Sequence, residues 1–168
     1  MQDANAAPRP SSVDFVGGEA VRVHELLRQY FDIHERTFKF SFRKVLPIPG
    51  LFEALDYRAY QDSLRSIHGD LILAADALAK HRQSGAPLSD HPFVPDLEAY
   101  AREVADAARR LGEICLALQH KSEARRGYNA ATYKSEVTAY KAVVATYHEM
   151  GGRLNVSFAA YRGVRTPS

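Results

Sequence analysis

Arginine and histidine stand close together in the first quarter of the chain, at Arg28 and His34, and this pair could carry out acid–base chemistry. A histidine can give or take a proton near neutral pH when it lies within hydrogen-bond reach of the group it serves. On adjacent turns of a helix, the guanidinium could hold a phosphodiester while the imidazole protonates it. The pair therefore defines one candidate catalytic site.

In one spacing, Arg28 followed by five residues and then His34, the chain resembles the HEPN family of helical ribonucleases. That family usually has asparagine or aspartate directly after the arginine, whereas this chain has Gln29. The resemblance covers these residues alone. It implies a phosphodiester-cleaving RNase in which Arg28 and His34 are the catalytic pair.

A second pattern recurs every seven residues near the end of the chain. Its first position holds Tyr133, Tyr140, Tyr147, Leu154 and Tyr161. The next position is mostly cationic and holds Lys134, Lys141, His148, Asn155 and Arg162. A period of seven keeps each set in line along a helix that packs in a bundle. The repeat therefore predicts a row of aromatic rings flanked by a row of cations.

Two interpretations of this repeat are open. The tyrosines can be boundary residues, with their rings in the core and their hydroxyls at the water. Alternatively they form a recognition face with the neighbouring cations, because tyrosine supplies rigid contact area and cations attract acidic groups or phosphates. That face would consist of Tyr133, Lys134, Tyr140, Lys141, Tyr147 and His148. We expect it to bind a partner protein or a second copy of the chain rather than nucleic acid.

Cations also gather at helix ends that should meet at one pole of a bundle, among them Arg43, Lys44, Arg125 and Arg126. Such a basic pole could receive an anion, an acidic protein segment or nucleic acid. Cations at helix C-termini also complement the helix dipole, which explains the same cluster without a ligand. The pole is the second candidate binding surface.

The sequence lacks patterns for metal or nucleophilic chemistry. No glutamate is followed by histidine three residues later, as di-iron bundles require, and His-Glu-x-x-His does not occur. Cys115 is the only cysteine and lies in an apolar run, so we expect a buried thiol of low reactivity. We therefore expect no metal and no cofactor, and we favour a non-enzymatic protein.

Four segments with helical periodicity position all of these residues. Apolar side chains alternate at spacings of three and four over about 19–44, 54–82, 96–125 and 131–162, and prolines and glycines separate the segments. In the first segment the predicted core stripe is Val23, Leu27, Tyr30, His34 and Thr37. The short connections favour an all-α fold, an antiparallel up-down-up-down four-helix bundle with long helices. The last helix should continue through Gly151-Gly152, because the heptad phase survives there.

Composition sets the remaining bounds. A length of 168 residues fits one domain, and a net charge of +2 is too small to indicate nucleic acid. No window approaches eighteen uninterrupted apolar residues, so we expect no transmembrane helix, and the first residues do not resemble a secretory signal. We expect a cytoplasmic protein with a flexible arm at 1–18, a bundle domain at 19–162 and a short tail at 163–168.

Overall fold

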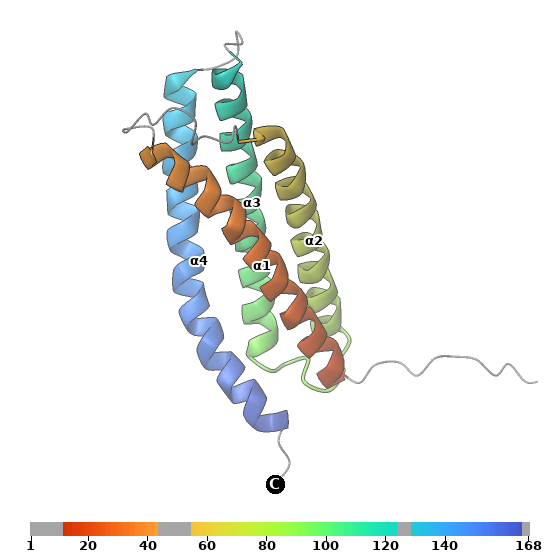
Figure 1. Ribbon diagram of the computed structural model, residues 1–168. Helices are drawn as coiled ribbons and strands as arrows, with labels where there is room; N and C mark the ends of the chain where they lie inside the picture. Colours follow the sequence, from red (N-terminus) through yellow and green to blue (C-terminus); the bar gives the residue numbers. More distant parts are fainter. Residues whose placement is uncertain (1–11, 44–54, 124–128, 166–168) are drawn as a thin grey trace, which may run out of the picture.

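The computed structural model describes residues 12–43, 55–123 and 129–165. Within these ranges the chain forms four helices and no strand: α1 (Ser12–Arg43), α2 (Tyr57–Gln83), α3 (Phe93–Ser122) and α4 (Ala130–Arg165) (Figure 1). Their packing is that of a helical bundle, so the predicted all-α class is confirmed. In the described part of the chain, no helix combines the length and the apolar character needed to cross a membrane.

Local side chains explain where the helices begin and end. The Asp56 carboxylate accepts a hydrogen bond from a backbone N–H in the first turn of α2 at 3.0 Å, and the Asn129 side chain accepts two from α4 at 2.8 and 3.2 Å. These caps satisfy donors that a first turn leaves free. After α2, Gly85 has a φ of +63°, which glycine adopts without strain. α3 begins at Phe93, and the acidic Asp96 lies in its first turn.

α1 begins earlier than the sequence predicted. It starts at Ser12 rather than Glu19, so residues 12–18 are part of the bundle and not of a flexible arm. The reason is Val16, which is fully buried and lies seven residues before the buried Val23. Val16 thus extends the heptad seam of the helix toward its N-terminus.

The buried face of α1 also differs from the predicted stripe. Leu26 and Ile33 are buried, whereas Leu27 and His34, which the pattern placed in the core, are only half-buried. Leu26 and Ile33 fit the spacing of three and four along a helix as well as Leu27 and His34 do. The apolar pattern therefore did not show which of the two pairs is buried. The consequence is that Leu27 and His34 are free to face α4 rather than the centre of the bundle.

α3 is the central helix and packs against each of the other three. Its predicted stripe is buried at Leu97, Tyr100, Val104, Ala107, Leu111 and Ile114, and that of α2 at Leu64, Ile67, Leu71, Ala74 and Leu78. A second row on α3 is made of small buried residues, Ala101, Ala105, Ala108 and Gly112. This row lies against α2: a Cβ added at Gly112 would be 3.9 Å from the Cβ of Leu64, and the Ala105 carbonyl lies 3.0 Å from Nδ1 of His68.

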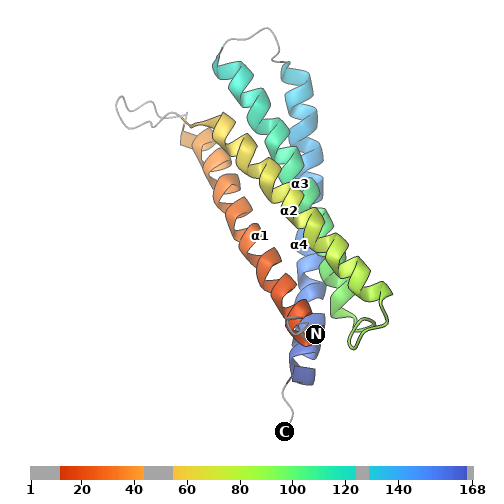
Figure 2. The ribbon, with the colours of Figure 1, turned by 90° about the vertical axis from the view of Figure 1, so that its right-hand side faces the viewer.

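α1 crosses the bundle obliquely in front of α3 (Figures 1 and 2). Its N-terminal half lies next to α2, where the rings of Phe15 and His81 are 5.0 Å apart and Arg22 pairs with Asp70 at 3.0 Å. Its C-terminal half instead contacts α4 around Tyr140. The N-terminal half of α1 and the C-terminal half of α4 therefore diverge, and α3 lies between them.

α4 is one continuous helix through Gly151 and Gly152, as predicted, and it curves along its length (Figure 1). A Cβ added at Gly151 would lie 3.6 Å from Cε2 of Tyr100, which is an ordinary contact, and one at Gly152 would meet nothing within 4 Å. Neither glycine is needed to make room for a neighbour. Tyrosines packed at heptad spacing on either side keep the helix in phase across the pair.

Two leucines two positions apart on α2 provide a matched test of this packing. Leu71 is fully buried, whereas Leu73 is 60% exposed. We expect Leu71→Ala to lower the free energy of unfolding by about 2–5 kcal/mol, because it removes core contacts and leaves a cavity. Leu73→Ala should change it by no more than about 0.5 kcal/mol. Urea denaturation followed by circular dichroism measures both, and equal losses would contradict the packing described.

Candidate functional site

Three polar side chains join α1 to α4 inside the bundle. The hydroxyls of Tyr30 and Tyr140 lie 2.5 Å apart, and Nδ1 of His34 lies 2.5 Å from the same Tyr140 hydroxyl. Tyr30 and Tyr140 are almost completely buried, and His34 is half-buried. We term Tyr30, His34 and Tyr140 the polar link.

The pKa shifts of these groups favour the uncharged form of all three side chains. Burial lowers the pKa of His34, an effect that His148 reinforces and Glu35 opposes, so the ring is neutral at pH 7 and Nδ1 can accept. Burial raises the pKa of both tyrosines, so their hydroxyls keep their protons. With the Nε2–H tautomer of His34, Tyr30 donates to Tyr140 and Tyr140 donates to Nδ1 of His34, whereas with the Nδ1–H tautomer the order is reversed. In either order no proton is duplicated.

Aromatic rings surround the polar link. Phe38 stacks on Tyr140 with ring centroids 5.6 Å apart, and Phe31 meets Tyr147 edge-on at 6.2 Å. His148 stacks on Tyr147 at 4.8 Å and is exposed to solvent. Ring pairs of this kind stabilise a contact beyond the area they bury. The contact between the C-terminal half of α1 and the N-terminal half of α4 therefore combines aromatic packing with a chain of hydrogen bonds.

The tyrosine repeat lies mostly inside the bundle. Tyr140, Tyr147 and Tyr161 are each 1% exposed, and Tyr133 is half-buried. The rings of Tyr140 and Tyr147 therefore cannot form the surface of a recognition face, because a partner could not reach them. The row beside them is accessible: Lys134, Lys141, His148, Asn155 and Arg162 are all exposed.

Arg28 and His34 do not share a cleft. The Arg28 side chain is 70% exposed and its guanidinium lies 3.8 Å from the Glu25 carboxylate, whereas the His34 ring faces Tyr140 in the polar link. Six residues at 3.6 residues per turn place the two side chains about 120° apart around the helix. One of them therefore cannot protonate a phosphodiester that the other holds.

The structure does not place the basic pole. Lys44, Arg125 and Arg126 lie outside the described residues, as does the side chain of Arg43 at the end of α1. The binding of an anion there stays a prediction from the sequence.

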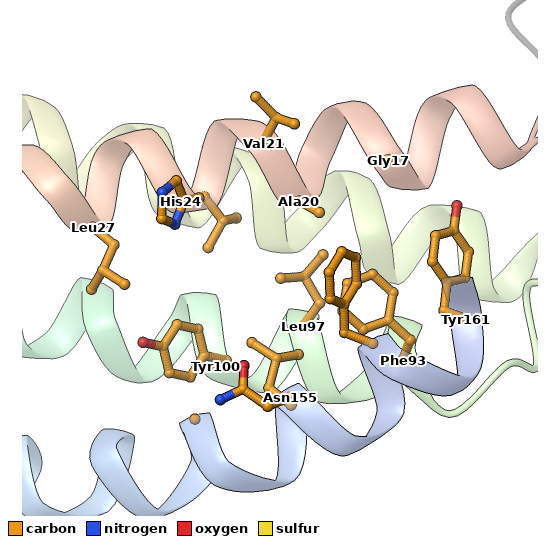
Figure 3. Close-up of a pocket in the computed structure, with 14 residues that line it drawn as sticks. Gly17, Ala20, Val21, His24, Leu27, Phe93, Leu97, Tyr100, Asn155 and Tyr161 are labelled. Carbon is orange, nitrogen blue, oxygen red and sulfur yellow. The ribbon is translucent and has the colours of Figure 1, made fainter. Parts of the chain in front are cut away.

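A groove of about 460 Å³ opens where α1 and α4 diverge (Figure 3). Its floor is Phe93, Leu97 and Tyr100 of α3. The main wall residues are Gly17, Ala20, Val21, His24 and Leu27 of α1, and Gly151, Leu154, Asn155, Phe158 and Tyr161 of α4. This volume is within the range of ligand sites, which are apolar with a few placed polar groups. The groove is therefore the principal candidate site.

Hydrogen-bonding side chains enter the groove from three helices: His24 from α1, Tyr100 from α3 and Asn155 from α4. In Figure 3 these three lie toward the end marked by Leu27, and Phe93 lies toward the other end. Burial, aided by the nearby Tyr147 hydroxyl, raises the pKa of Tyr100 to about 12, so its hydroxyl stays protonated. None of the residues that line the groove is acidic. One end is thus polar and without an acidic side chain, and the rest is apolar.

Two large exposed apolar side chains lie on opposite walls of this groove, and two more lie nearby on α4 outside its lining. Val21 is 70% exposed and Phe158 is 38% exposed, and both line it. Val156 and Val164 are exposed on the same C-terminal half of α4. Among the described residues, Leu73 on α2 is the remaining large apolar side chain of this exposure. Such clustering marks surfaces that bind another molecule.

Sequence reasoning found part of this site and missed the rest. It placed Asn155 in the row beside the tyrosines, but it identified neither His24 nor Tyr100 as a site residue. The available signal was Val21, a large apolar residue outside the predicted core stripe of α1. The groove itself depends on the oblique path of α1, which the helical periodicity does not encode.

Among the described residues, the lining of the groove contains neither a cluster of metal ligands nor a thiol. Within the described ranges, no group of three or more His, Cys, Asp or Glu side chains is placed to hold a metal ion. Cys115 is buried with its Sγ 3.8 Å from the Thr37 hydroxyl, and burial raises the pKa of its thiol to about 11. The thiol is therefore a core group, as predicted, and it does not reach the groove.

The polar link should make stability depend on pH. The pKa of His34 is about 6.5 in the unfolded chain and lower in the folded chain, so below pH 6.5 the unfolded state binds more protons. The free energy of unfolding should therefore be highest above pH 6.5 and should fall as the pH drops through the folded-state pKa of His34. His34→Gln should flatten this slope in urea titrations at pH 5 to 8. An unchanged slope in the variant would assign the effect to another group.

Comparison with protein-family models, with curated proteins and with solved structures gives no match for this chain. No relative therefore suggests a ligand or a reaction. The features of the molecule that bear on function are the groove, its exposed apolar edges and its polar end.

Proposed function

We propose that the protein is a non-enzymatic interaction protein that binds a helical segment of another protein in the groove between α1 and α4. The observation that carries this proposal is the groove itself, which opens over α3 where the two outer helices diverge and is flanked by the exposed side chains of Val21 and Phe158. A helix laid there would complete the packing around α3 as a further bundle helix. Binding of an amphipathic helix in an apolar groove is a recurrent mode of peptide recognition.

The exposed edges of the groove support a macromolecular occupant. Val21 and Phe158 stand on opposite walls and keep much of their surface in water. A helix between these walls would cover both side chains and bury apolar area, which drives association. A small molecule seated on the floor would leave most of the Val21 side chain exposed.

The cationic row of α4 gives the groove an electrostatic edge. Lys134, Lys141 and His148 are exposed on the part of α4 that precedes the groove, Asn155 lines the groove, and Arg162 follows one heptad later. We propose that this row steers an acidic partner toward the groove, as charge complementarity does at other interfaces. In this form the Tyr/basic face predicted from the sequence acts through its cations, while its tyrosines hold α4 in place. A second copy of the chain is one such partner.

The proposal takes the four helices to alternate in direction, as the sequence predicts, and the cytoplasm to be the site of binding. Contacts between distant ends support the alternation: Phe15 near the start of α1 meets His81 near the end of α2, and Thr37 near the end of α1 meets Cys115 of α3. The buried free thiol of Cys115 fits a reducing compartment.

Site-specific photocrosslinking in cells tests the function directly. Val21 on the groove and Leu73 on α2 are matched controls, since both are exposed apolar side chains, at 70% and 60%. We expect p-benzoylphenylalanine at position 21 to give a protein adduct of defined mass on irradiation in the native host, at several times the yield from position 73. The reason is that a bound helix would contact the groove wall and not the outer face of α2.

A second substitution shows whether the adduct depends on the groove. Phe158→Glu places a charge on the opposite wall and should abolish the adduct from position 21, while Val156→Glu, outside the groove lining, should preserve it. No adduct from position 21, or an equal adduct from position 73, would refute the proposed function.

A further inference from the structure

The dimensions of the groove match a short helix. Its α1 wall runs from Gly17 to Leu27, and its α4 wall runs from Gly151 to Tyr161. Ten residues of helix rise about 15 Å, so either wall is as long as nearly three turns of an inserted helix. The floor residues Phe93, Leu97 and Tyr100 follow each other at the spacing of core contacts on a helix, which suits apolar side chains on successive turns of the occupant.

The polar end of the groove is suited to an acceptor that carries a negative charge. His24, Tyr100 and Asn155 each present an N–H or O–H donor, and an ionised carboxylate accepts through both of its oxygens. A cationic group would find no acidic side chain among the lining residues to balance its charge. Arg162 lies one heptad after Asn155 along α4 and adds a positive charge to the same edge.

From this arrangement we infer that the partner helix carries one inward-facing aspartate or glutamate within its apolar face, and that His24, Tyr100 and Asn155 receive its carboxylate. The inference rests on the proposed function and adds the chemistry of the partner. The rest of the inserted face is apolar, because it meets Leu97, Leu154 and Phe158. The carboxylate sets the register of the helix, since a shift by one turn would bury it against apolar side chains without a donor.

A display selection against the whole protein tests this partner chemistry. The library is a set of 15-residue helical peptides with apolar residues fixed on one face and a single position of that face randomised to all twenty amino acids. We expect aspartate and glutamate to be enriched at least tenfold over asparagine and glutamine, because a hydrogen bond to a charged group is worth more than one between neutral groups.

Two tyrosines of the groove form a matched pair of variants. Tyr100→Phe removes the hydroxyl at the polar end and should reduce the acidic enrichment at least fivefold. Tyr161→Phe removes a hydroxyl from the opposite end of the groove, away from His24, Tyr100 and Asn155 (Figure 3), and should leave the acidic enrichment unchanged. Thermal unfolding of both variants checks that each is folded under the selection conditions.

The outcomes separate this inference from the proposed function. Apolar or basic residues at the randomised position, or no binder at all, would overturn the inference. So would a loss of acidic enrichment in Tyr161→Phe equal to that in Tyr100→Phe. A fatty acid also combines an apolar chain with a carboxylate, and dodecanoate, added as a competitor, tests this alternative ligand. Tight binding of dodecanoate without any peptide binder would assign the groove to a fatty acid. A groove-dependent protein adduct without acidic preference would leave the function standing and refute the inference alone.

Discussion

The close pairing of α2 with α3 is the contact on which the rest of the molecule depends. Small residues make it close: Ala101, Ala105, Ala108 and Gly112 form a row on α3 that leaves room for the larger side chains of α2. Salt bridges between Arg82 and Glu98 and between Arg102 and Asp76 extend the pairing to the surface. Exposed pairs of this kind contribute little to stability, so burial along the small-residue row accounts for most of it.

The close pairing of α2 with α3 determines where the other two helices lie. Because α2 and α3 are joined so closely, α1 rests across them and not in a symmetric fourth corner of the bundle. One half of α1 packs beside α2 through Phe15 and Arg22, and the other half reaches α4 through Tyr30 and His34. The groove over α3 consequently opens beside the N-terminal half of α1. The candidate site is a direct result of unequal helix packing.

Helix periodicity predicted the elements and most of the core, because a seven-residue seam records which side of a helix faces a neighbour. The seams of α2 and α3 and the continuity of α4 were predictable for that reason. The pattern failed on α1, where Leu26 and Leu27 are equally apolar and only the crossing direction decides which one is buried. It also failed for Ser12 to Gly18, since two adjacent glycines obscured a helix that the buried Val16 secures.

The candidate site was less predictable than the fold because it is formed between elements. The sequence places Asn155 and His148 in one row, but the meeting of Asn155 with His24 and Tyr100 requires the relative positions of three helices. The tyrosine row illustrates the same limit. Its regular spacing is evident in the sequence, whereas the direction in which the rings point is decided by where α3 and α1 lie.

α4 contributes residues to both the polar link and the groove, and its continuity connects the two. It runs unbroken from Ala130 to Arg165, about 54 Å at 1.5 Å per residue, with Tyr140 in its first half and the groove wall in its second. Because the helix is continuous, a shift of its C-terminal half on binding would be transmitted along its axis toward the hydrogen bond between Tyr140 and His34. Coupled equilibria are reciprocal. If filling the groove loosens that bond and eases protonation of His34, then protonating His34 must strengthen binding in the groove by the same factor.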